Sequence, residues 1–479
     1  MRFAIRQIDL FERDVRLRLP FRFGIVTLTA APQAFVRARI RLEDGREAEG
    51  AAAELLAPKW FDKSPALSNE QNFDQLRLSL ALAREAYLAG GTNSAFGHFW
   101  THYEPHMVQA AARGLNALTA NFGPALIDRA ALDALCRALG ISFYQAIRDD
   151  EVGMLSSGTE PELIRGRSPN SIGDAARASS GSVPEFGRFR ATLKPSSRIG
   201  ARHTVGLVDP ITSVEQRVND GLPETLAEVV ARYGHRWFKL KVGGDVGADV
   251  ERLAAIASVL DRLPDYAVSL DGNEQYDSID GVLELWRRMN AEPRLRRLVA
   301  SIAFIEQPIK RQNALTADVS VLSQEKPVII DESDDTLDAF PRARTLGYRG
   351  VSSKACKGIY KSIINAARCQ AWGSEYFVTG EDLTVQAGLA LQQDLALVSL
   401  LGLTQVERNG HHYVNGMAGL PTQEQDAFLR AHPDLYERSH GAVRVRISKG
   451  ELAIGSLDCA GFASGAMPDW QHLREMKTR

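Results

Sequence analysis

The sequence has few cysteines and no long apolar run. Its four cysteines are scattered without the spacing of a disulfide framework or a metal cluster, at Cys136, Cys356, Cys369 and Cys459. No stretch approaches the roughly 20 apolar residues that a membrane-spanning helix needs. Residues 1–23 interleave charged and apolar side chains, so they lack the apolar centre of a signal peptide. We therefore expect a cytoplasmic protein in a reducing environment.

The chain also has almost no net charge. Its 57 Lys and Arg against 59 Asp and Glu give a formal charge of −2. This balance argues against a basic surface for nucleic acid or an acidic membrane, so we expect a small-molecule ligand instead. The 479 residues, 44% apolar and 24% charged, are typical of a globular protein with one large domain and a smaller one.

Charged residues follow short apolar runs at five places in the middle of the chain. The groups are Lys239-Leu240-Lys241, Asp271-Gly272-Asn273, Ile305-Glu306-Gln307-Pro308, Asp331-Glu332-Ser333 and Val351-Ser352-Ser353-Lys354. Amphipathic segments separate the runs, as in alternating strands and helices. The pattern predicts an α/β fold, a (β/α) barrel whose strands include 237–242, 267–271, 302–306, 328–331 and 350–354. In such a barrel the chemistry lies at the carboxyl ends of the strands, where these charges fall.

Five of these side chains suit a metal-assisted proton transfer. Asp271, Glu306 and Asp331 follow three neighbouring strands, and Mg2+ prefers a few carboxylate oxygens with room left for water and substrate. Lys241 and Lys354 follow strands that are four apart in a ring of eight, so they would face each other across the barrel mouth. Burial, a second lysine and a nearby cation all lower the pKa of a lysine, which would let either amine act as a base.

Each group alone has a plainer interpretation. A Lys-x-Lys pair is also typical of a solvated edge strand, and Asp271 before Gly272 is typical of a turn. Asp331-Glu332-Ser333 could equally begin a helix. The occurrence of five such groups in order, one to a strand, favours a single site.

With these five groups, and with Lys354-Ala355-Cys356-Lys357-Gly358, the sequence resembles the enolase superfamily. The branch is that of muconate lactonizing enzyme and the dipeptide epimerases, in the mandelate racemase/muconate lactonizing enzyme family. The resemblance implies a modified TIM barrel, (β/α)7β, with an α+β capping domain. It implies Mg2+, or Mn2+ in its place, and loss of a proton α to a substrate carboxylate to give an enediolate. It favours Asp331 over Glu332 as ligand. Independently of the resemblance, we expect Lys357 on the next helical turn, outside the site.

The resemblance also implies roles for individual residues. Lys241 and Lys354 would be the two bases, and Lys239, Asn273 and Glu407 would bind substrate. The expected seventh strand, 376–379, ends without the histidine that the mandelate racemase branch uses as a base, so lysine on both sides fits better. We expect a racemase or epimerase of an amino-acid derivative or related acid. The alternatives are a syn-elimination like that of o-succinylbenzoate synthase, cycloisomerisation, acid-sugar dehydration, or a binding paralogue without turnover.

The rest of the chain is expected to build the cap and enclose the barrel. We expect the cap at 1–150, with strands near 3–5, 15–19 and 34–42 and helices at 69–88, 103–121 and 124–139. An insertion is expected at 151–201, a barrel at 202–420 with its first strand at 204–208, and a segment at 421–479 that returns to the cap through a hairpin of 443–447 and 451–454. Family members commonly assemble, so a homo-oligomer is expected.

Two cap loops, at 20–31 and 53–63, are expected to close over the barrel. The first would contribute Phe21, Phe23, Ile25 and Val26, the second Trp60 and Phe61, with Arg22 and Lys59 as polar exceptions. The same aromatic side chains would equally serve to pack the cap on the barrel. His411 and His412 follow the last strand, and their alternatives are contact with substrate or a solvated loop.

Overall fold

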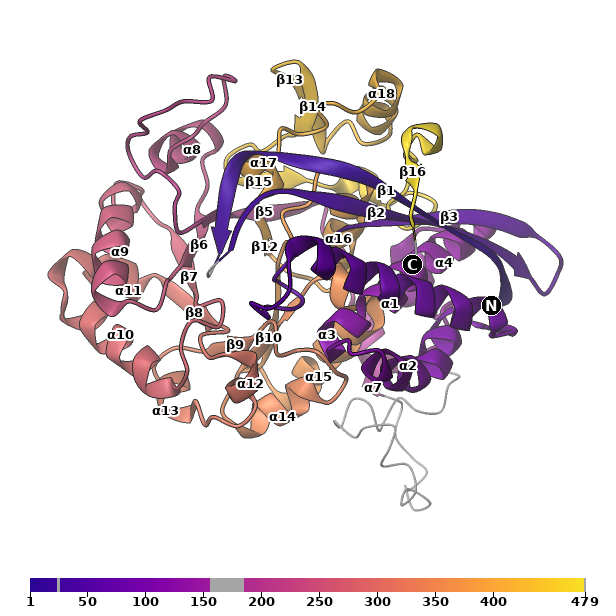
Figure 1. The fold of residues 1–479 in the computed structure, drawn as a ribbon, viewed down its shortest axis with the longest axis horizontal. Helices are drawn as coiled ribbons and strands as arrows, with labels where there is room; N and C mark the ends of the chain where they lie inside the picture. The colour runs from indigo at the N-terminus through magenta and orange to yellow at the C-terminus, as the bar shows by residue number, and fades with distance from the viewer. Residues whose placement is uncertain (24–25, 156–184, 478–479) are drawn as a thin grey trace.

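A closed barrel of parallel strands forms the larger part of the molecule, on the left in Figure 1. The protein is described by a computed structural model over residues 1–23, 26–155 and 185–477. The barrel strands are β5 (Arg198–Val205), β6 (Trp237–Lys241), β7 (Ala267–Asp271), β8 (Ile302–Glu306), β9 (Val328–Ile330), β10 (Gly350–Ser353), β11 (Phe377–Gly380) and β12 (Gln405–Arg408). Parallel pairing of β12 with β5 closes the ring. This confirms the predicted barrel, although its first strand begins at 198 and not at 204.

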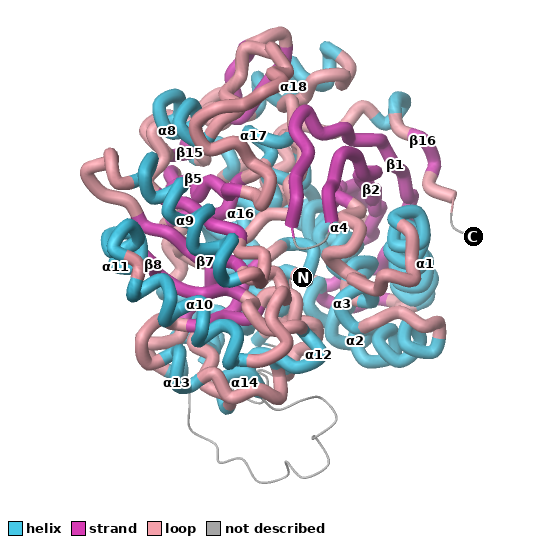
Figure 2. The backbone as a smooth tube through the Cα atoms, turned by 60° about the vertical axis from the view of Figure 1, so that its left-hand side comes forward, coloured by secondary structure: helices cyan, strands magenta, loops and turns pink. Residues whose placement is uncertain are grey.

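Helices surround the barrel strands on the outside, as Figure 2 shows. They are α8 (Leu226–Tyr233), α9 (Val246–Leu260), α10 (Ile279–Ala291), α11 (Arg296–Ala300), α12 (Arg311–Ala314), α13 (Ser320–Ser323), α14 (Ala339–Thr345), α15 (Ile359–Trp372) and α16 (Leu389–Leu400). Local capping explains where several begin: Thr225 and Glu228 form a capping box at α8, and Asp245 caps α9. After β12 only the four-residue α17 (Gly410–Tyr413) follows, so the barrel is of the (β/α)7β kind.

The cap combines a five-stranded antiparallel sheet with helices. Its strands are β1 (Arg2–Phe23), β2 (Val26–Leu42), β3 (Glu47–Leu55), β4 (Thr92–Ser94) and β16 (Arg474–Glu475). Its helices are α1 (Asn69–Ala89), α2 (Ala95–Ala112), α3 (Ala117–Ala120), α4 (Phe122–Leu139) and α5 (Phe143–Arg148), with α7 (Glu185–Thr192) beside α15. The two strands expected near 3–5 and 15–19 are one long strand, β1, interrupted by register shifts.

The helix expected at 103–121 is wrong by about eight residues at its start. Ser94 caps α2 by accepting a hydrogen bond from the backbone of Gly97, so the helix begins at Ala95 and contains Pro105. The chain then turns at Gly114, where φ is +79°, and this ends the helix. The predicted helices at 69–88 and 124–139 correspond to α1 and α4.

The hairpin expected from 443–447 and 451–454 is present only at its turn, where Ser448 and Glu451 form an antiparallel bridge, and its strands pair elsewhere. β14 (Ala442–Val445) pairs instead with the preceding β13 (Tyr436–Ser439), and β15 (Glu451–Ala453) pairs with β5 of the barrel. His440 and Gly441 both have positive φ in the two-residue turn between β13 and β14, which favours that hairpin. α18 (Thr422–Ala431) precedes it. The segment that does return to the cap is β16, which pairs with β1.

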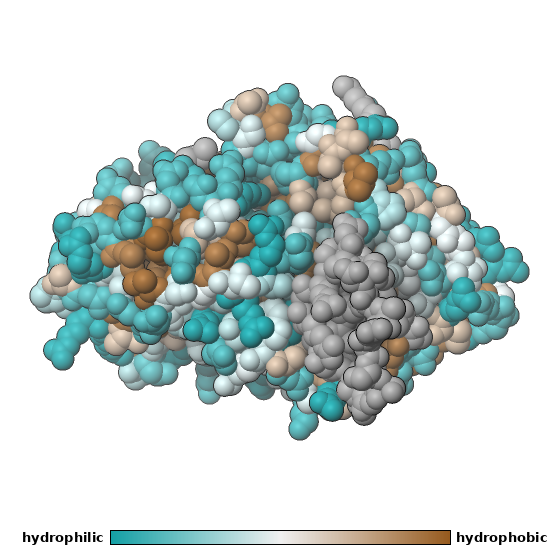
Figure 3. Space-filling model, turned by 90° about the horizontal axis from the view of Figure 1, so that it is seen from below, coloured by the Kyte–Doolittle hydropathy of each residue, from teal (hydrophilic) through white to brown (hydrophobic). Residues whose placement is uncertain are grey.

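The β1–β2 hairpin extends from the cap across the barrel, and its end lies near β6 and β7 in Figure 1. A backbone hydrogen bond from Leu207 to the carbonyl of Arg22 joins this hairpin to the loop after β5. Seen from below in Figure 3, the outer surface is mainly hydrophilic, with apolar side chains gathered on the left. None of the described helices is long and apolar enough to cross a membrane. Residues 156–184 of the expected insertion lie outside the described residues.

Candidate active site

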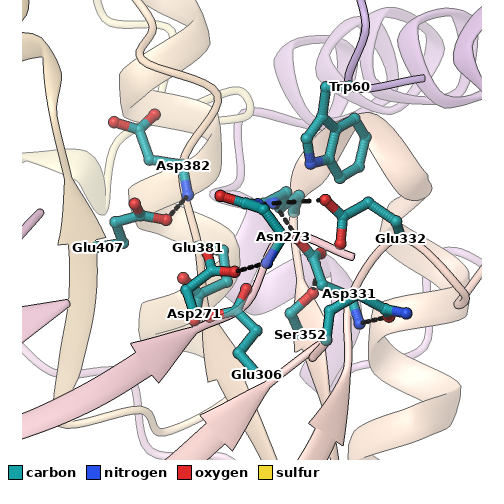
Figure 4. Close-up of polar contacts among 12 residues, drawn as sticks. Trp60, Asp271, Asn273, Glu306, Asp331, Glu332, Ser352, Glu381, Asp382 and Glu407 are labelled. Atoms are coloured by element: carbon teal, nitrogen blue, oxygen red, sulfur yellow. Dashed lines mark hydrogen bonds and ion pairs between the residues drawn. The ribbon is translucent and has the colours of Figure 1, made fainter. Parts of the chain in front are cut away.

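Three carboxylates end neighbouring strands of the barrel. Asp271 ends β7 and lies in register with Glu306 at the end of β8. Glu306 in turn pairs with Ile329, two residues before Asp331. All three are buried, and Figure 4 draws them at adjacent strand ends. The register of parallel pairing therefore brings together the three residues that the sequence nominated as metal ligands.

The two lysines nominated as bases flank this row of carboxylates. Lys241 Nζ lies 2.5 Å from Asp271 Oδ2 at one end, and Lys354 Nζ lies 2.5 Å from Asp331 Oδ2 at the other. Their strands, β6 and the end of β10, are four apart in the ring of eight. The amines therefore approach the row from opposite sides, and both line the same cavity.

Lys239 lies at the centre of the acidic groups. Its Nζ is 2.8 Å from oxygens of Asp271, Glu306 and Glu381, and 3.2 Å from Glu407. Burial opposes the charge on this amine, but the four carboxylates outweigh burial and raise the pKa of Lys239 well above its ordinary value. Lys239 is therefore a fixed cation that binds the acidic groups to one another.

Glu407, expected to bind substrate, is engaged on both oxygens. It accepts hydrogen bonds from Thr204, from the backbone of Asp382 and from Asn409, in addition to its contact with Lys239. Its pKa lies well below the ordinary value: burial would raise it, but Lys239 and Lys241 outweigh that effect. Glu407 lines the cavity as an anion whose position is fixed by its neighbours.

Several buried oxygens near these residues carry more negative charge than the neighbouring lysines offset, or have no hydrogen-bond partner among the described residues. Burial, together with the carboxylates of Asp271 and Glu381, raises the pKa of Glu306 well above its ordinary value. Glu332 Oε2 and Asn273 Oδ1 are buried and make no hydrogen bond within the described residues. Because these atoms are oxygens on or beside neighbouring strand ends, they fit a hard dication such as Mg2+. Asp271, Glu306 and Asp331 are the side chains best placed to hold one.

Two lysines of the site, Lys357 and Lys354, have surroundings that the sequence did not reveal. Lys357 does lie in a short helical turn, but its Nζ reaches inward to Asp331, 3.4 Å from Oδ1. The pKa of Lys354 was expected to be lowered; burial does act in that direction, but the adjacent Asp331 outweighs it and raises the pKa. Sequence spacing could not reveal an ion pair of this kind, because it depends on side-chain conformation.

Glu332 belongs to the rim between cap and barrel. Its Oε1 lies 3.3 Å from the amine of Lys63, which also bonds the carbonyl of Asn273 at 2.8 Å. The amide of Asn273 lies 3.3 Å from the same carboxylate oxygen, and Figure 4 shows this contact. Lys63 of the second cap loop thereby contacts the end of β7, which connects the cap to the row of carboxylates.

Sequence reasoning missed two buried residues of the site. Glu381, directly after β11, contacts Lys239 and accepts a hydrogen bond from Thr379. Arg202 on β5 forms a buried ion pair with Glu381. Glu381 was overlooked because that strand end was searched only for a histidine, and Arg202 because the first strand was placed too late. A charged residue after the seventh strand was the available signal.

A largely apolar cavity lies above the lysines. It measures about 390 Å³, part of it open to solvent, and its apolar lining is Phe21, Phe23, Leu28, Ala57, Trp60 and Leu383. The Trp60 ring centroid is 4.2 Å from Lys354 Nζ, close enough for a cation–π interaction. The cap thus supplies most of the apolar wall, with Leu383 after β11 added to it, while the barrel supplies the charged side chains below.

The expected lid is only partly as predicted. Residues 20–31 are mainly strand and not loop, with Ile25 outside the described residues and Val26 half-buried. Phe61 packs edge-on against Phe122 of α4 and does not line the cavity. Arg22 is exposed, and the buried Lys59 donates to loop carbonyl groups. The aromatic residues therefore divide between the two expected roles, enclosing the cavity and packing the cap.

His411 and His412 do not take part in this cavity. Neither is among the residues that line it, and neither lies in a solvated loop, since His412 is buried and His411 half-buried. They lie in α17 beside the outer side of β5, where His203 and His411 are in hydrogen-bond contact. Both alternatives considered for them are wrong.

Comparison with known proteins agrees with this architecture. Residues 221–434 match the family described as enolase C-terminal domain-like. No curated protein sequence matches the chain. Dipeptide epimerase from Enterococcus faecalis V583, solved with Mg and the dipeptide L-Leu-L-Tyr, has 15% identity and a TM-score of 0.56, over 96% of this chain and 99% of that one.

Two further solved structures are similar over most of their length. 2-Chloromuconate cycloisomerase from Rhodococcus opacus 1CP has 17% identity and a TM-score of 0.56, over 98% of each chain. N-succinyl Arg/Lys racemase from Bacillus cereus ATCC 14579 has 19% identity and a TM-score of 0.53, over 86% of this chain and 88% of that one. At these identities the likeness shows a shared fold.

Proposed function

We propose, from the premise that this chain belongs to the enolase superfamily in its mandelate racemase/muconate lactonizing enzyme branch, that it removes the proton α to a substrate carboxylate. It is an isomerase or lyase, and we assign it to racemisation or epimerisation of an amino-acid derivative or related acid. One observation carries this assignment: Lys241 and Lys354 contact opposite ends of the same row of carboxylates. Two amines in this arrangement can reach both faces of one α carbon.

We further propose that Asp271, Glu306 and Asp331 hold Mg2+, or Mn2+ in its place. The bound ion would supply positive charge for the carboxylate of the substrate and for the enediolate that forms from it. The buried, unpartnered oxygens beside these residues and the raised pKa of Glu306 support a site that lacks positive charge. A preference for Zn2+ or Cu2+ is not supported here, since every proposed ligand is an oxygen, which suits Mg2+ and Mn2+.

The lysines would do the proton transfer. One amine takes the α proton at its Nζ, and the other returns a proton to the opposite face, which inverts the stereocentre. Each amine touches a proposed metal ligand, so its protonation state depends on the charge of that carboxylate. Lys239 has a different task, because its amine is already shared among four carboxylates and holds them in place while charge develops nearby.

The cavity favours a substrate with an apolar substituent. Phe21, Phe23 and Leu28 form its outer wall, and Trp60 covers Lys354. An acid sugar would place hydroxyl groups against these rings without hydrogen-bond partners, which is unfavourable. N-acylated or dipeptide derivatives of apolar amino acids fit the walls better, and elimination or cycloisomerisation of an apolar acid is the second candidate.

The test is solvent hydrogen exchange at the α carbon. The protein would be incubated in deuterated buffer with Mg2+ and a panel of dipeptides and N-acyl amino acids, and deuterium would be followed by NMR. Lys241→Met and Lys354→Met should each lose about 10²–10⁴-fold in exchange from one enantiomer while keeping exchange from the other. Lys194→Met, which changes an exposed lysine, serves as the control.

The possible outcomes separate the candidate functions. Loss of all activity in one lysine variant, with little effect of the other, would favour an elimination that uses a single base. A binding paralogue would show no exchange with any substrate. Exchange that persists after complete removal of divalent metal would overturn the proposed role of Asp271, Glu306 and Asp331.

A further inference from the structure

A second group of potential metal ligands lies outside the barrel, away from the carboxylates. His203 is on β5, His235 precedes β6, and His411 is in α17 after β12. One ring nitrogen from each lies within 4.8 Å of the others. These three residues are here called the histidine triad. They come from β5 and from the segments next to its two neighbouring strands, β6 and β12.

The orientation of His235 is that of a metal ligand. Its Nδ1 lies 2.8 Å from the carbonyl oxygen of Ala201, so that nitrogen carries the proton and donates it. Its Nε2 is then left with a free lone pair, and this fully buried atom has no hydrogen-bond partner within the described residues. A backbone carbonyl that fixes the tautomer in this way is the usual second partner of a metal-bound histidine.

The other two imidazoles are close to each other. His203 Nδ1 lies 3.3 Å from His411 Nε2. That is about the separation of two nitrogens around a tetrahedral ion with Zn–N bonds of about 2.0–2.1 Å. The widest pair in the triad, at up to 4.8 Å, would have to draw in by roughly 1.5 Å, which side-chain rotation can supply.

We propose that the histidine triad binds a transition-metal dication of the Zn2+ class, at a site distinct from the proposed Mg2+ site. Imidazole nitrogen is a preferred ligand of Zn2+, Co2+, Ni2+ and Cu2+, whereas Mg2+ prefers oxygen. The two sites therefore select different ions by ligand chemistry. Three protein ligands leave a fourth position for water or a small anion.

The protonation and charge of the surroundings are compatible with this ion. Burial lowers the pKa of His235 to about 4 and the pKa values of His203 and His411 well below the ordinary value, so all three are neutral at pH 7. The nearest cations are already paired, Arg18 with Asp220 and Arg408 with Asp394. No carboxylate joins the triad among the residues that the structure describes, which makes an anionic fourth ligand favourable.

The position of the triad suggests what the ion would do. β5 pairs with β12 to close the barrel, and His203 and His411 lie on either side of that junction. An ion held there would link the first barrel strand, through His203, to the segment after the last strand, through His411, and to the residues just before β6, through His235. Its effect would be on the stability of barrel closure, since none of the three histidines lines the cavity above the lysines.

The experiment uses full-length, tag-free protein freed of metal by a chelator and then saturated with Mg2+ to occupy the oxygen site. Co2+ is titrated as a spectroscopic probe, because imidazole-bound tetrahedral Co2+ absorbs visible light. Zn2+ should displace one equivalent of Co2+ and abolish that absorption. We expect His235→Gln to weaken Zn2+ binding by more than the roughly 10–100-fold typical of losing only an outer partner.

Controls separate the triad from other histidines. His432→Gln removes a buried histidine that contacts Ser456 and lies outside the triad, and it should leave Co2+ binding unchanged. If His235→Gln does not fold, His411→Gln at the half-buried position provides the same test. Absence of the Co2+ absorption in the native protein, or equal Zn2+ affinity in native and His235→Gln proteins, would overturn the proposal and identify the triad as a packed imidazole cluster.

Discussion

Replacing Lys239 by methionine tests the electrostatic arrangement of the site without requiring a substrate. The substitution keeps a long side chain but removes the ammonium that contacts four buried carboxylates. Removing one partner of a buried ion pair costs about 3–5 kcal/mol, because the remaining charge is left uncompensated. With an unfolding entropy of ~2.1 cal/mol/K per residue over 479 residues, each degree of change in melting temperature corresponds to about 1 kcal/mol of unfolding free energy. We therefore expect the melting temperature of the metal-free protein to fall by roughly 3–5 °C.

The loss should depend on pH in a defined direction. The pKa of Glu306 is already raised in the folded protein, and removal of the ammonium would raise it further. A carboxyl with a raised folded pKa stabilises the fold below its unfolded pKa and loses that contribution as pH rises through the folded value. The variant should therefore lose more stability at pH 8 than at pH 5, where a carboxyl takes up a proton in place of the missing charge.

Differential scanning calorimetry in a chelator, at several pH values, would measure both effects, with circular dichroism to verify folding. The matched control is Lys310→Met, which removes an exposed lysine 2.6 Å from Asp277 and should change stability by less than about 1 kcal/mol. A Lys239→Met protein as stable as the native one at pH 8 would refute the idea that this ammonium neutralises the acidic cluster.

Three further predictions concern the cavity and the cap. Trp60→Ala removes an aromatic wall of the cavity and should raise KM for the substrate found by the exchange screen by about 10–100-fold, the equivalent of about 1.5–3 kcal/mol of apolar burial. Phe61→Leu, at a residue that does not line the cavity, should leave KM unchanged, and an unchanged KM in Trp60→Ala would exclude Trp60 from binding. Burial raises the pKa of Asp128 to about 8, so native stability should fall as pH rises from about 4 to 8. Asp128→Asn should remove this slope and be more stable at pH 9 by up to about 5 kcal/mol, and parallel stability curves would contradict the assignment. Gly50→Ala would put a Cβ 2.1 Å from the backbone nitrogen of Ala134 in α4, and it should lower the free energy of unfolding, measured by chemical denaturation, by at least about 1–3 kcal/mol. Gly247→Ala, whose Cβ would have its nearest atom at 3.5 Å, should leave that free energy unchanged. Equal stability of the two variants would mean that α4 shifts freely.

The errors in the sequence prediction share a physical cause. β1 was divided in two because register shifts interrupt its alternation, and the C-terminal hairpin was assigned to the wrong strands because several short strands there have equal local preference. Lys357 was left out of the site because its place in the turn after β10 gave no sign of where its side chain points, and Glu381 because the end of β11 was searched only for a histidine. The histidine triad draws on positions 203, 235 and 411, which no local pattern connects.

The sequence by itself determined the barrel and the row of carboxylates, because each strand must bury its apolar residues and a parallel barrel puts every strand's carboxyl end at one mouth. Asp271, Glu306, Asp331, Lys241 and Lys354 were identifiable for that reason. Only the tertiary structure decided how their charges are balanced. The pairing of Lys354 with Asp331 and of Lys239 with four carboxylates depends on side chains from different strands meeting at hydrogen-bond distance. Such contacts follow from three-dimensional packing, which periodicity along one chain does not encode.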